Sequence, residues 1–504
     1  MIICNRSVIK NVKGTETAKL KQQNMKPLSK FLIFISIIIG LMLESNITFS
    51  SLPEYLIQDT ITGSWLGELE IPNTAKLRMG ITISKTIDNS YKAFLNIIDQ
   101  ATGDIPCDEV IHKNDSVIIR INGLGIEVAG IIDSEHKSIM SEFRQRGGIF
   151  PILFKRVDKL PELLRPQEPK KPYSYNEENV VFENKKAGVK LAGTLTFPKS
   201  KTKIPAVVLV TGSGQQDRNE EVGKHKPFWI IADYLTRNGI AVLRVDDRGI
   251  GGSTGIFDQS TTGDFAEDAL AGITFLKNRQ EINPKKIGIV GHSEGGTVAA
   301  LAASKSSDVA FIVSMAGVFT NFEDVVIDQI LNQLRLQGIK DEDIELERNW
   351  RKKIYSLAKE NTDSATAAKN LWEIYNKLPE DEVVRLNWPK GRQDAQIEQV
   401  LNPWWRYILG MDNKTILINV KCPVLAIYGE LDQQVIPDKN IPVIEEASKE
   451  GDNKNFTVKK LPGLNHLFQT ARTGSEYEYV RIEETISPQA LHMISDWILK
   501  QVKN

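Results

Sequence analysis

The residues Gly291–Gly296 (GHSEGG) place a serine, Ser293, between glycines in a pattern that can support nucleophilic chemistry. The preceding run, Lys286–Val290, is apolar and β-branched, which predicts a buried parallel strand. The small residues that follow predict a helix. A strand, a Gly-x-Ser-x-Gly turn and a helix together are typical of a nucleophile elbow, in which the serine hydroxyl projects above a sheet. Gly291 and Gly295 are its structural glycines, because larger side chains there would collide with neighbouring backbone.

A serine hydroxyl becomes a strong nucleophile only when a base accepts its proton, and that base needs an orienting acid. Both types of residue follow Ser293, each in a loop after a predicted strand. Asp432 comes after Cys422–Tyr428 and His466 comes after Phe456–Val458, with room for a helix between them. We therefore predict Ser293 as nucleophile, His466 as general base and acid, and Asp432 as orienting acid.

Other residues compete for the roles of base and acid. His292 lies inside the elbow, where its ring cannot reach the neighbouring hydroxyl in the required direction. His492 falls in a predicted C-terminal helix, and His225 lies in a loop near the proposed site, where it could contact substrate. Glu430 is an alternative to Asp432 as the acid.

An oxyanion hole needs two preorganised N–H groups that point at the developing negative charge. We expect one N–H from Glu294, the residue after the nucleophile. The second should come from the loop Thr211–Arg218 (TGSGQQDR), from either Ser213 or Gly214. The same loop lacks the Lys-Ser/Thr ending of a phosphate-binding loop.

A third glycine-rich turn, Asp246–Ser253 (DDRGIGGS), follows another predicted strand. It contains no Gly-x-Gly-x-x-Gly, and its acidic residues precede its glycines, so it does not predict dinucleotide binding. We interpret it as structural, with Asp247 and Arg248 tying adjacent loops together.

The elements around these motifs alternate between strand and helix. Val180–Glu183 and Lys190–Phe197 predict an antiparallel hairpin, after which the pattern becomes βαβ. The predicted elements beyond the hairpin are Ala206–Val210, Phe228–Asn238, Ala241–Val245, Gly263–Lys277, Asp308–Ala316, Cys422–Tyr428, Phe456–Val458 and Pro488–Lys500. This alternation predicts a doubly wound, mostly parallel sheet.

Residues 319–413 interrupt the alternation with a long, charged and helical stretch that contains five of the eight tryptophans. An insertion at this point should lie over the carboxyl ends of the strands, where ligands bind in such sheets. We predict a helical lid whose tryptophans mostly form its own core.

The region 58–157 has a different pattern, with alternating apolar and polar residues separated by turn signals. Short strands at regular spacing predict a small antiparallel barrel or sandwich. It contains no set of residues suited to catalysis. The proline-rich segment 158–176 then predicts an extended linker, and the catalytic domain should span 177–504.

Composition excludes several classes of function. The chain of 504 residues has 63 basic and 64 acidic residues, a net charge of −1, which favours neither nucleic acid nor an anionic membrane as partner. Its 3 cysteines and 6 histidines have no spacing typical of a disulfide framework or a metal site. We expect no metal, no cofactor and a small-molecule substrate; the oligomeric state is not predicted.

The first 50 residues predict export. A basic segment, Lys26–Lys30, precedes the apolar run Phe31–Leu43, which is shorter than the roughly 20 residues needed to span a bilayer. Thr48 and Ser50 offer small residues for cleavage of a signal peptide. Met25 stands directly before this segment, so 1–24 could be a mis-assigned start. We expect a periplasmic or extracellular bacterial protein with no membrane span after cleavage; the alternative is an N-terminal membrane anchor.

The elbow, the TGSGQQDR loop, the DDRGIGGS turn and the pair Asp432 and His466 together resemble the α/β-hydrolase superfamily. More narrowly, 177–504 is similar to EstD-like bacterial esterases with a serine aminopeptidase-type (S33-like) hydrolase domain. The β domain, with Gly63–Gly67 (GSWLG) and Arg146–Phe150 (RGGIF), looks like one that often precedes this hydrolase. The resemblance implies hydrolysis of carboxylic esters by the proposed triad.

The leading hypothesis is therefore a serine hydrolase that cleaves carboxylic esters of small or medium acyl chains through an acyl-enzyme intermediate. Peptidase or amidase activity, or acyl transfer to an alcohol, would use the same three residues. A non-catalytic binding protein on a hydrolase scaffold is the alternative from another class.

Overall fold

The computed structural model describes residues 61–70, 76–100, 102–145, 147–360 and 363–503. The predicted signal segment 1–50 lies outside this part of the chain. Along these described ranges, no helix is both long and apolar enough to cross a membrane.

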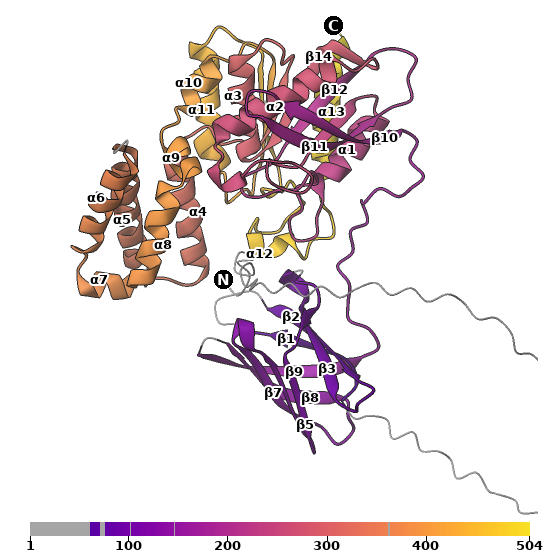
Figure 1. The fold of residues 1–504 in the computed structure, drawn as a ribbon, viewed down its shortest axis with the longest axis vertical. Helices are drawn as coiled ribbons and strands as arrows, with labels where there is room; N and C mark the ends of the chain where they lie inside the picture. Colours follow the sequence, from indigo (N-terminus) through magenta and orange to yellow (C-terminus); the bar gives the residue numbers. More distant parts are fainter. Residues whose placement is uncertain (1–60, 71–75, 101, 146, 361–362, 504) are drawn as a thin grey trace, which may run out of the picture.

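The N-terminal domain is one antiparallel sheet of nine strands in the order β4-β3-β2-β1-β9-β8-β7-β6-β5 (Figure 1). Its alternating sequence buries one face, where Trp65, Phe143 and Phe154 form the centre of the core. The strands are β1 (Gly63–Leu69), β2 (Leu77–Lys85), β3 (Tyr91–Ile97), β4 (Ile105–Pro106), β5 (Glu109–Lys113), β6 (Ser116–Ile121), β7 (Ile126–Ile132), β8 (Ser138–Gln145) and β9 (Gly148–Val157), with short 3-10 turns η1 (Ile98–Gln100) and η2 (Asn122–Leu124).

This sheet curls so that β3 and β5, near opposite ends of the strand order, come into contact. The N–H of Cys107 donates to the Ala93 carbonyl on β3, while the N–H of Asp108 donates to the Arg120 carbonyl on β6. Consecutive residues thus bond to opposite ends of the strand order, so the domain is a rolled half-barrel rather than a two-sheet sandwich.

The second sheet has eight strands in the order β10-β11-β13-β12-β14-β15-β16-β17. The hairpin of the first two strands is antiparallel, β11 pairs antiparallel with β13, and all later pairs are parallel. The strands are β10 (Asn176–Asn184), β11 (Val189–Phe197), β12 (Ile204–Val210), β13 (Ala241–Val245), β14 (Ile282–His292), β15 (Ile312–Met315), β16 (Val424–Gly429) and β17 (Phe456–Leu461). The predicted α/β-hydrolase sheet and its opening hairpin are therefore confirmed.

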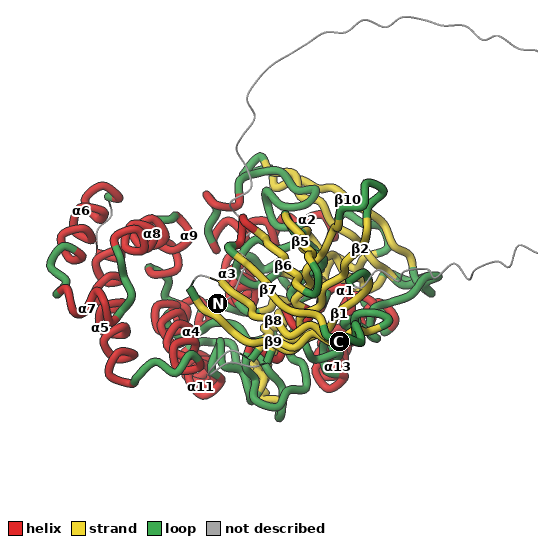
Figure 2. The backbone as a smooth tube through the Cα atoms, turned by 90° about the horizontal axis from the view of Figure 1, so that it is seen from below, coloured by secondary structure: helices red, strands yellow, loops and turns green. Residues whose placement is uncertain are grey.

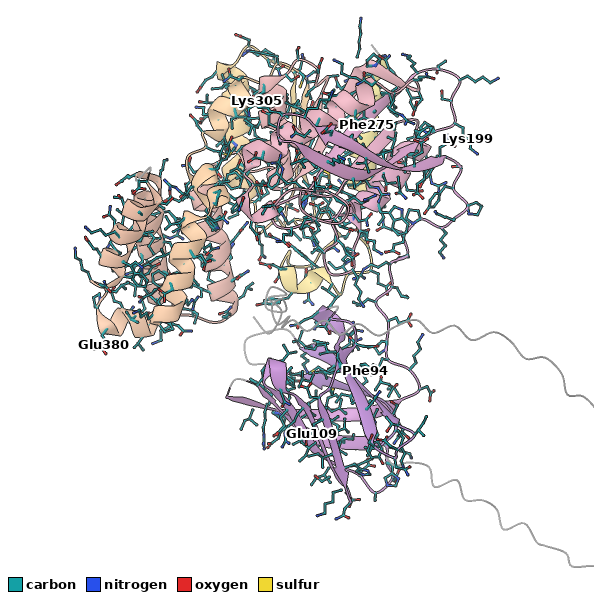
Figure 3. All side chains as sticks on the ribbon, viewed as in Figure 1. Phe94, Glu109, Lys199, Phe275, Lys305 and Glu380 are labelled. Atoms are coloured by element: carbon teal, nitrogen blue, oxygen red, sulfur yellow. The ribbon has the colours of Figure 1, made fainter. Side chains whose placement is uncertain are left out.

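Helices cover both faces of this sheet because its crossovers run in two directions from β12. The connection to β13 places α1 (Pro227–Arg237) against α13 (Pro488–Lys503), whereas the later crossovers place α2 (Thr262–Lys277) against α3 (Glu294–Lys305). The helix α11 (Pro437–Glu450) contacts β17. Phe275 of α2, labelled in Figure 3, stacks on Phe182 of β10 with ring centroids 5.1 Å apart.

The predicted lid is helical, but much of it stands beside the sheet. Its helices are α4 (Phe322–Leu336), α5 (Asp341–Glu360), α6 (Ser364–Tyr375), α7 (Glu380–Arg385), α8 (Lys390–Leu401), α9 (Pro403–Leu409) and α10 (Asn413–Ile418). Figures 1 and 2 show α5–α8 projecting to one side, with Glu380 at the far end in Figure 3. In contrast, α9 contacts α2 and the short turn η3 (Phe257–Gln259) near the carboxyl ends of the strands.

The prediction that the lid tryptophans form a core of their own is not confirmed, because Trp388 and Trp405 belong to one continuous apolar cluster with the catalytic sheet. Trp388 is fully buried, and the Arg351 guanidinium lies 5.3 Å from its ring centroid. Arg351 also pairs with Glu347 at 2.9 Å inside the projecting helices. Trp404 on α9 reaches the elbow through its bond to Glu294.

The linker is hydrogen-bonded to the catalytic domain. Arg165 donates hydrogen bonds to the backbone carbonyls of Gly223 and Val480, and Gln167 accepts from the N–H of Thr485. The β domain adds a salt bridge of 3.0 Å between Asp99 and Arg481. The linker and the β domain therefore both contact the loop that follows His466.

Candidate active site

The elbow occupies the turn between β14 and α3, and its backbone is strained at the serine. Ser293 has φ 53° and ψ −122°, a conformation that non-glycine residues rarely adopt. A Cβ on Gly291 would lie 2.0 Å from the Gly295 carbonyl oxygen, and one on Gly295 would lie 2.2 Å from that of Val210. Both positions therefore require glycine, as the sequence predicted from packing.

The predicted acid and base meet in two neighbouring loops after β16 and β17. Nδ1 of His466 lies 2.8 Å from Oδ2 of Asp432, and both side chains are buried. The other oxygen of Asp432 accepts N–H groups of Gln434 and Val435 at 2.8 and 2.9 Å, which fixes the carboxylate. A carboxylate accepts a hydrogen bond from Nδ1–H, so the neutral ring keeps its proton on Nδ1 and a lone pair on Nε2, as a general base requires.

His466 also lies against the elbow. Its backbone carbonyl is 3.0 Å from Nε2 of His292, and the two imidazole centroids are 4.8 Å apart. In the part of the chain that the structure describes, no hydrogen bond joins Oγ of Ser293 to the ring of His466. This contact is often long in an unliganded enzyme and tightens when substrate binds.

The competing residues have other partners. Glu430 is exposed and accepts the N–H of Gly463 at 3.0 Å, so its carboxylate does not replace that of Asp432. His492 is exposed on α13, where its ring contacts Tyr234 edge-on.

The prediction that His225 could contact substrate is wrong, because its side chain is buried. Its ring nitrogens each lie 2.8 Å from a partner, the Thr485 hydroxyl and the Tyr479 carbonyl. Burial, together with the nearby charge of Arg165, lowers the pKa of His225 to about 4, so this ring is neutral at pH 7. Its role is to hold the loop after His466.

The predicted oxyanion loop runs beside the nucleophile. A Cβ on Gly212 would lie 3.2 Å from Cβ of Ser293, a tight contact that a side chain could make only if its neighbours shifted. The Gly212 N–H is already bonded to Oε1 of Glu220 at 2.7 Å. The N–H groups of Ser213 and Gly214 follow it, and Gly214 has φ 95°, a conformation suited to glycine.

The sequence predicts a role only for the N–H of Glu294, but its side chain also makes contacts at the elbow. Its carboxyl is fully buried and accepts hydrogen bonds from the Thr262 hydroxyl at 2.7 Å and from Nε1 of Trp404 at 2.8 Å. Burial raises the pKa of Glu294, although both hydrogen bonds oppose the shift. The bond from Trp404 ties α9 to the residue that follows the nucleophile.

The DDRGIGGS turn joins a neighbouring loop through Asp247, as predicted, whereas Arg248 binds a helix instead of a loop. Asp247 accepts the Thr211 hydroxyl at 2.8 Å and the Gln216 N–H at 3.0 Å, which shapes the oxyanion loop. Arg248 forms a salt bridge of 2.6 Å with Asp268 on α2. Burial raises the pKa of Asp247 to about 8.

A groove of about 380 Å³ opens between the oxyanion loop and the lid. Aromatic side chains of Phe257, Trp404 and Trp405 form part of its wall, and Gly214 connects it to the oxyanion loop. The remaining lining residues are Asp258, Ala395, Glu398, Gln399 and Asn402. The groove can therefore hold an apolar or aromatic part of a substrate beside the oxyanion loop.

Comparisons with known proteins agree with this architecture. A family model for X-Pro dipeptidyl-peptidases of the S15 family matches residues 187–462, more than half of the chain. Esterase EstD of Thermotoga maritima is 24% identical over 410 residues, which cover 79% of this chain and 92% of that protein.

Solved structures that match include Est1E from Butyrivibrio proteoclasticus with bound ferulic acid, at 18% identity and a TM-score of 0.38, covering 64% of this chain and 100% of that one. The α/β hydrolase GrgF from Penicillium sp. sh18 has 17% identity and a TM-score of 0.41, covering 65% and 100%. The fold assignment rests on the strand order and the family match.

The expected resemblance to α/β-hydrolases and to EstD-like esterases is confirmed, and the peptidase family that matches is S15. The chain belongs to the S15 peptidase family and is a serine hydrolase.

Proposed function

We propose that this protein hydrolyses carboxylic esters through an acyl-enzyme formed on Ser293. The observation that carries the proposal is the buried pair of His466 and Asp432, 2.8 Å apart, in the loops beside a strained serine turn. The similarity to Esterase EstD over most of both chains favours an ester as substrate.

In the proposed reaction, Nε2 of His466 accepts the proton of the Ser293 hydroxyl as its oxygen attacks the ester carbonyl. Asp432 holds the ring in the required tautomer and stabilises the imidazolium that forms. The Glu294 N–H and an N–H from Ser213 or Gly214 stabilise the oxyanion. The imidazolium then protonates the departing alcohol, and water releases the acid by the same steps.

The groove beside Gly214 supports an acyl or alcohol group with apolar or aromatic character. Its aromatic residues offer contact area, and its carboxylates Asp258 and Glu398 disfavour an anionic substrate. We therefore expect neutral esters of small or medium acyl chains to react fastest.

The test compares wild type with Ser293→Ala on a p-nitrophenyl ester. The variant should fold and lose turnover, and a fluorophosphonate probe should label wild type but not the variant. Near wild-type turnover by the variant would exclude Ser293 as the nucleophile.

Peptidase activity is the second candidate, favoured by the match to X-Pro dipeptidyl-peptidases. Its test is an X-Pro dipeptidyl naphthylamide assayed beside the p-nitrophenyl ester. A larger kcat/KM for the amide would make the protein a peptidase that uses the same three residues.

A further inference from the structure

A second buried carboxylate–histidine pair, Glu220 and His292, lies beside the pair of Asp432 and His466. Oε1 of Glu220 is 2.9 Å from Nδ1 of His292. Both side chains are almost completely buried, at 4% and 7% exposure, so water does not screen the interaction. The mechanism proposed above uses neither residue.

The partners of the His292 ring define its protonation. Nε2 faces the backbone carbonyl oxygen of His466 at 3.0 Å, and a carbonyl oxygen can only accept a hydrogen bond. Nε2 must therefore carry a proton. Nδ1 faces a carboxylate oxygen that also accepts the Gly212 N–H at 2.7 Å, so it too is placed to donate.

The surrounding charges agree with a ring that is protonated on both nitrogens. Burial lowers the pKa of His292, but the charge and hydrogen bond of Glu220 outweigh burial, and the pKa is raised. The charge of Asp432 acts in the same direction. The neutral neighbours are Met315, which pairs with His292 in the sheet, and Phe468, which contacts its ring edge-on.

The backbone of Glu220 is held in a conformation that costs energy. Its φ is 53°, in the left-handed region that residues with a Cβ avoid. Such strain is retained where surrounding contacts fix it, often at functional sites. Here it accompanies a carboxylate that joins the oxyanion loop to the elbow.

We propose that Glu220 and His292 form a charged positioning pair that links the oxyanion loop to the backbone of the general base. The inference rests on the proposed function, since it assigns His466 as the base. Three parts of the site are connected in series: Gly212 to Glu220, Glu220 to His292, and His292 to His466.

The consequence for catalysis follows from these three bonds. Nε2 of His292 holds the backbone carbonyl of His466, and Glu220 holds the Gly212 N–H of the oxyanion loop. Loss of the pair should therefore displace the general base and the oxyanion loop together, which lowers kcat more than it changes KM.

The first experiment observes the ring directly. Full-length protein carrying ¹⁵N-labelled histidine is measured by NMR at pH 7.5, with His292→Asn used to assign the signals. Both ring nitrogens of His292 should be protonated, and Glu220→Gln should leave only one protonated. A ring with one bare nitrogen in wild type would overturn the proposal, whatever the protein hydrolyses.

The second experiment measures kcat and KM separately on a p-nitrophenyl ester. In His292→Asn kcat should fall by about tenfold while KM stays close to wild type, because the pair positions reacting groups and does not bind substrate. The exposed residue His492 supplies the matched control, since His492→Asn should leave kcat and KM unchanged. An unchanged kcat in His292→Asn, or a loss that appears only in KM, would overturn the proposal.

These outcomes separate the inference from the proposed function. If Ser293→Ala keeps full activity, the proposed function fails while the NMR result still tests the charge of His292. If His292→Asn does not fold, the comparison of wild type with Glu220→Gln decides the protonation of the ring.

Discussion

Two carboxylate–histidine pairs lie next to each other in this site, and they differ in what faces the second ring nitrogen. In the pair of Asp432 and His466, Nδ1 is bonded and, among the described residues, no group of the protein is hydrogen-bonded to Nε2. In the pair of Glu220 and His292, the carbonyl of His466 occupies that position. The same residue types thus yield a base in one case and a fixed donor in the other.

The largest expected effect separates the two histidines by rate. His466→Asn should lower kcat on a p-nitrophenyl ester by about 10⁶-fold, because the nucleophile loses its base. His292→Asn should cost only about tenfold, as that ring holds other groups in place. The measurement is single-turnover and steady-state kinetics of both purified variants. Equal losses of kcat in the two variants would contradict the assignment of His466 as the base and of His292 as a positioning residue.

The next effect concerns the acid of the first pair. Asp432→Asn should reduce kcat by about 10⁴-fold, because an amide favours the wrong imidazole tautomer. Glu430→Gln is the matched control two residues away, and its rate should stay near wild type since Glu430 is exposed. A larger loss in Glu430→Gln would transfer the role of acid to that residue.

Local sequence was enough to predict the elbow and the first pair. Glycines at 291 and 295, a β-branched strand before them and small residues after them all describe one turn and the backbone that touches it. Asp432 and His466 were found because parallel strands end at one edge of a sheet, so loops distant in the chain must converge there.

The second pair escaped prediction because its parts are remote and its geometry is irregular. Glu220 lies 72 residues before His292, in a loop whose positive φ no sequence pattern indicated. Within the sequence, His292 is recognisable only as a rival base whose ring points in the wrong direction. Nε2 of His292 bonds to the backbone carbonyl of residue 466. Every residue type has such a carbonyl, so the sequence at 466 gives no sign of this contact.

In the lid and the β domain too, contacts between residues far apart in the chain could not be predicted from local sequence. Helical composition predicted the insertion, but its placement depends on contacts such as that of Trp404 with Glu294, which join residues far apart in the chain. Alternation predicted the strands of the first domain, whereas closure into a half-barrel depends on bonds from Cys107 and Asp108 to opposite ends of the sheet.

A smaller effect on rate is expected from the buried carboxyl of Glu294, which bonds to an indole instead of an imidazole. Trp404→Phe removes the indole N–H that bonds to Glu294 and should lower kcat/KM by about tenfold, which corresponds to about 1.4 kcal/mol. Trp350→Phe is the control, because its indole bonds to Glu382 within the projecting helices and should leave the rate unchanged. Similar losses in both variants would mean that general weakening of the lid causes the effect.

The smallest effect appears in stability and concerns Asp247, whose described partners are a hydroxyl and an N–H rather than a cation. Burial raises its folded pKa to about 8, above the roughly 3.9 of an unfolded aspartate. The neutral carboxyl therefore contributes to the free energy of unfolding fully below the unfolded pKa, and this contribution is lost as pH rises toward 8. The side chain in Asp247→Asn cannot ionise, so the variant should not lose this stability as pH rises. Its free energy of unfolding minus that of wild type should therefore be larger at pH 9 than at pH 5, by on the order of 1–3 kcal/mol. Urea denaturation at both pH values measures this change. A difference that stays constant between pH 5 and pH 9 would show that the carboxyl of Asp247 does not titrate in this range and would contradict the raised pKa.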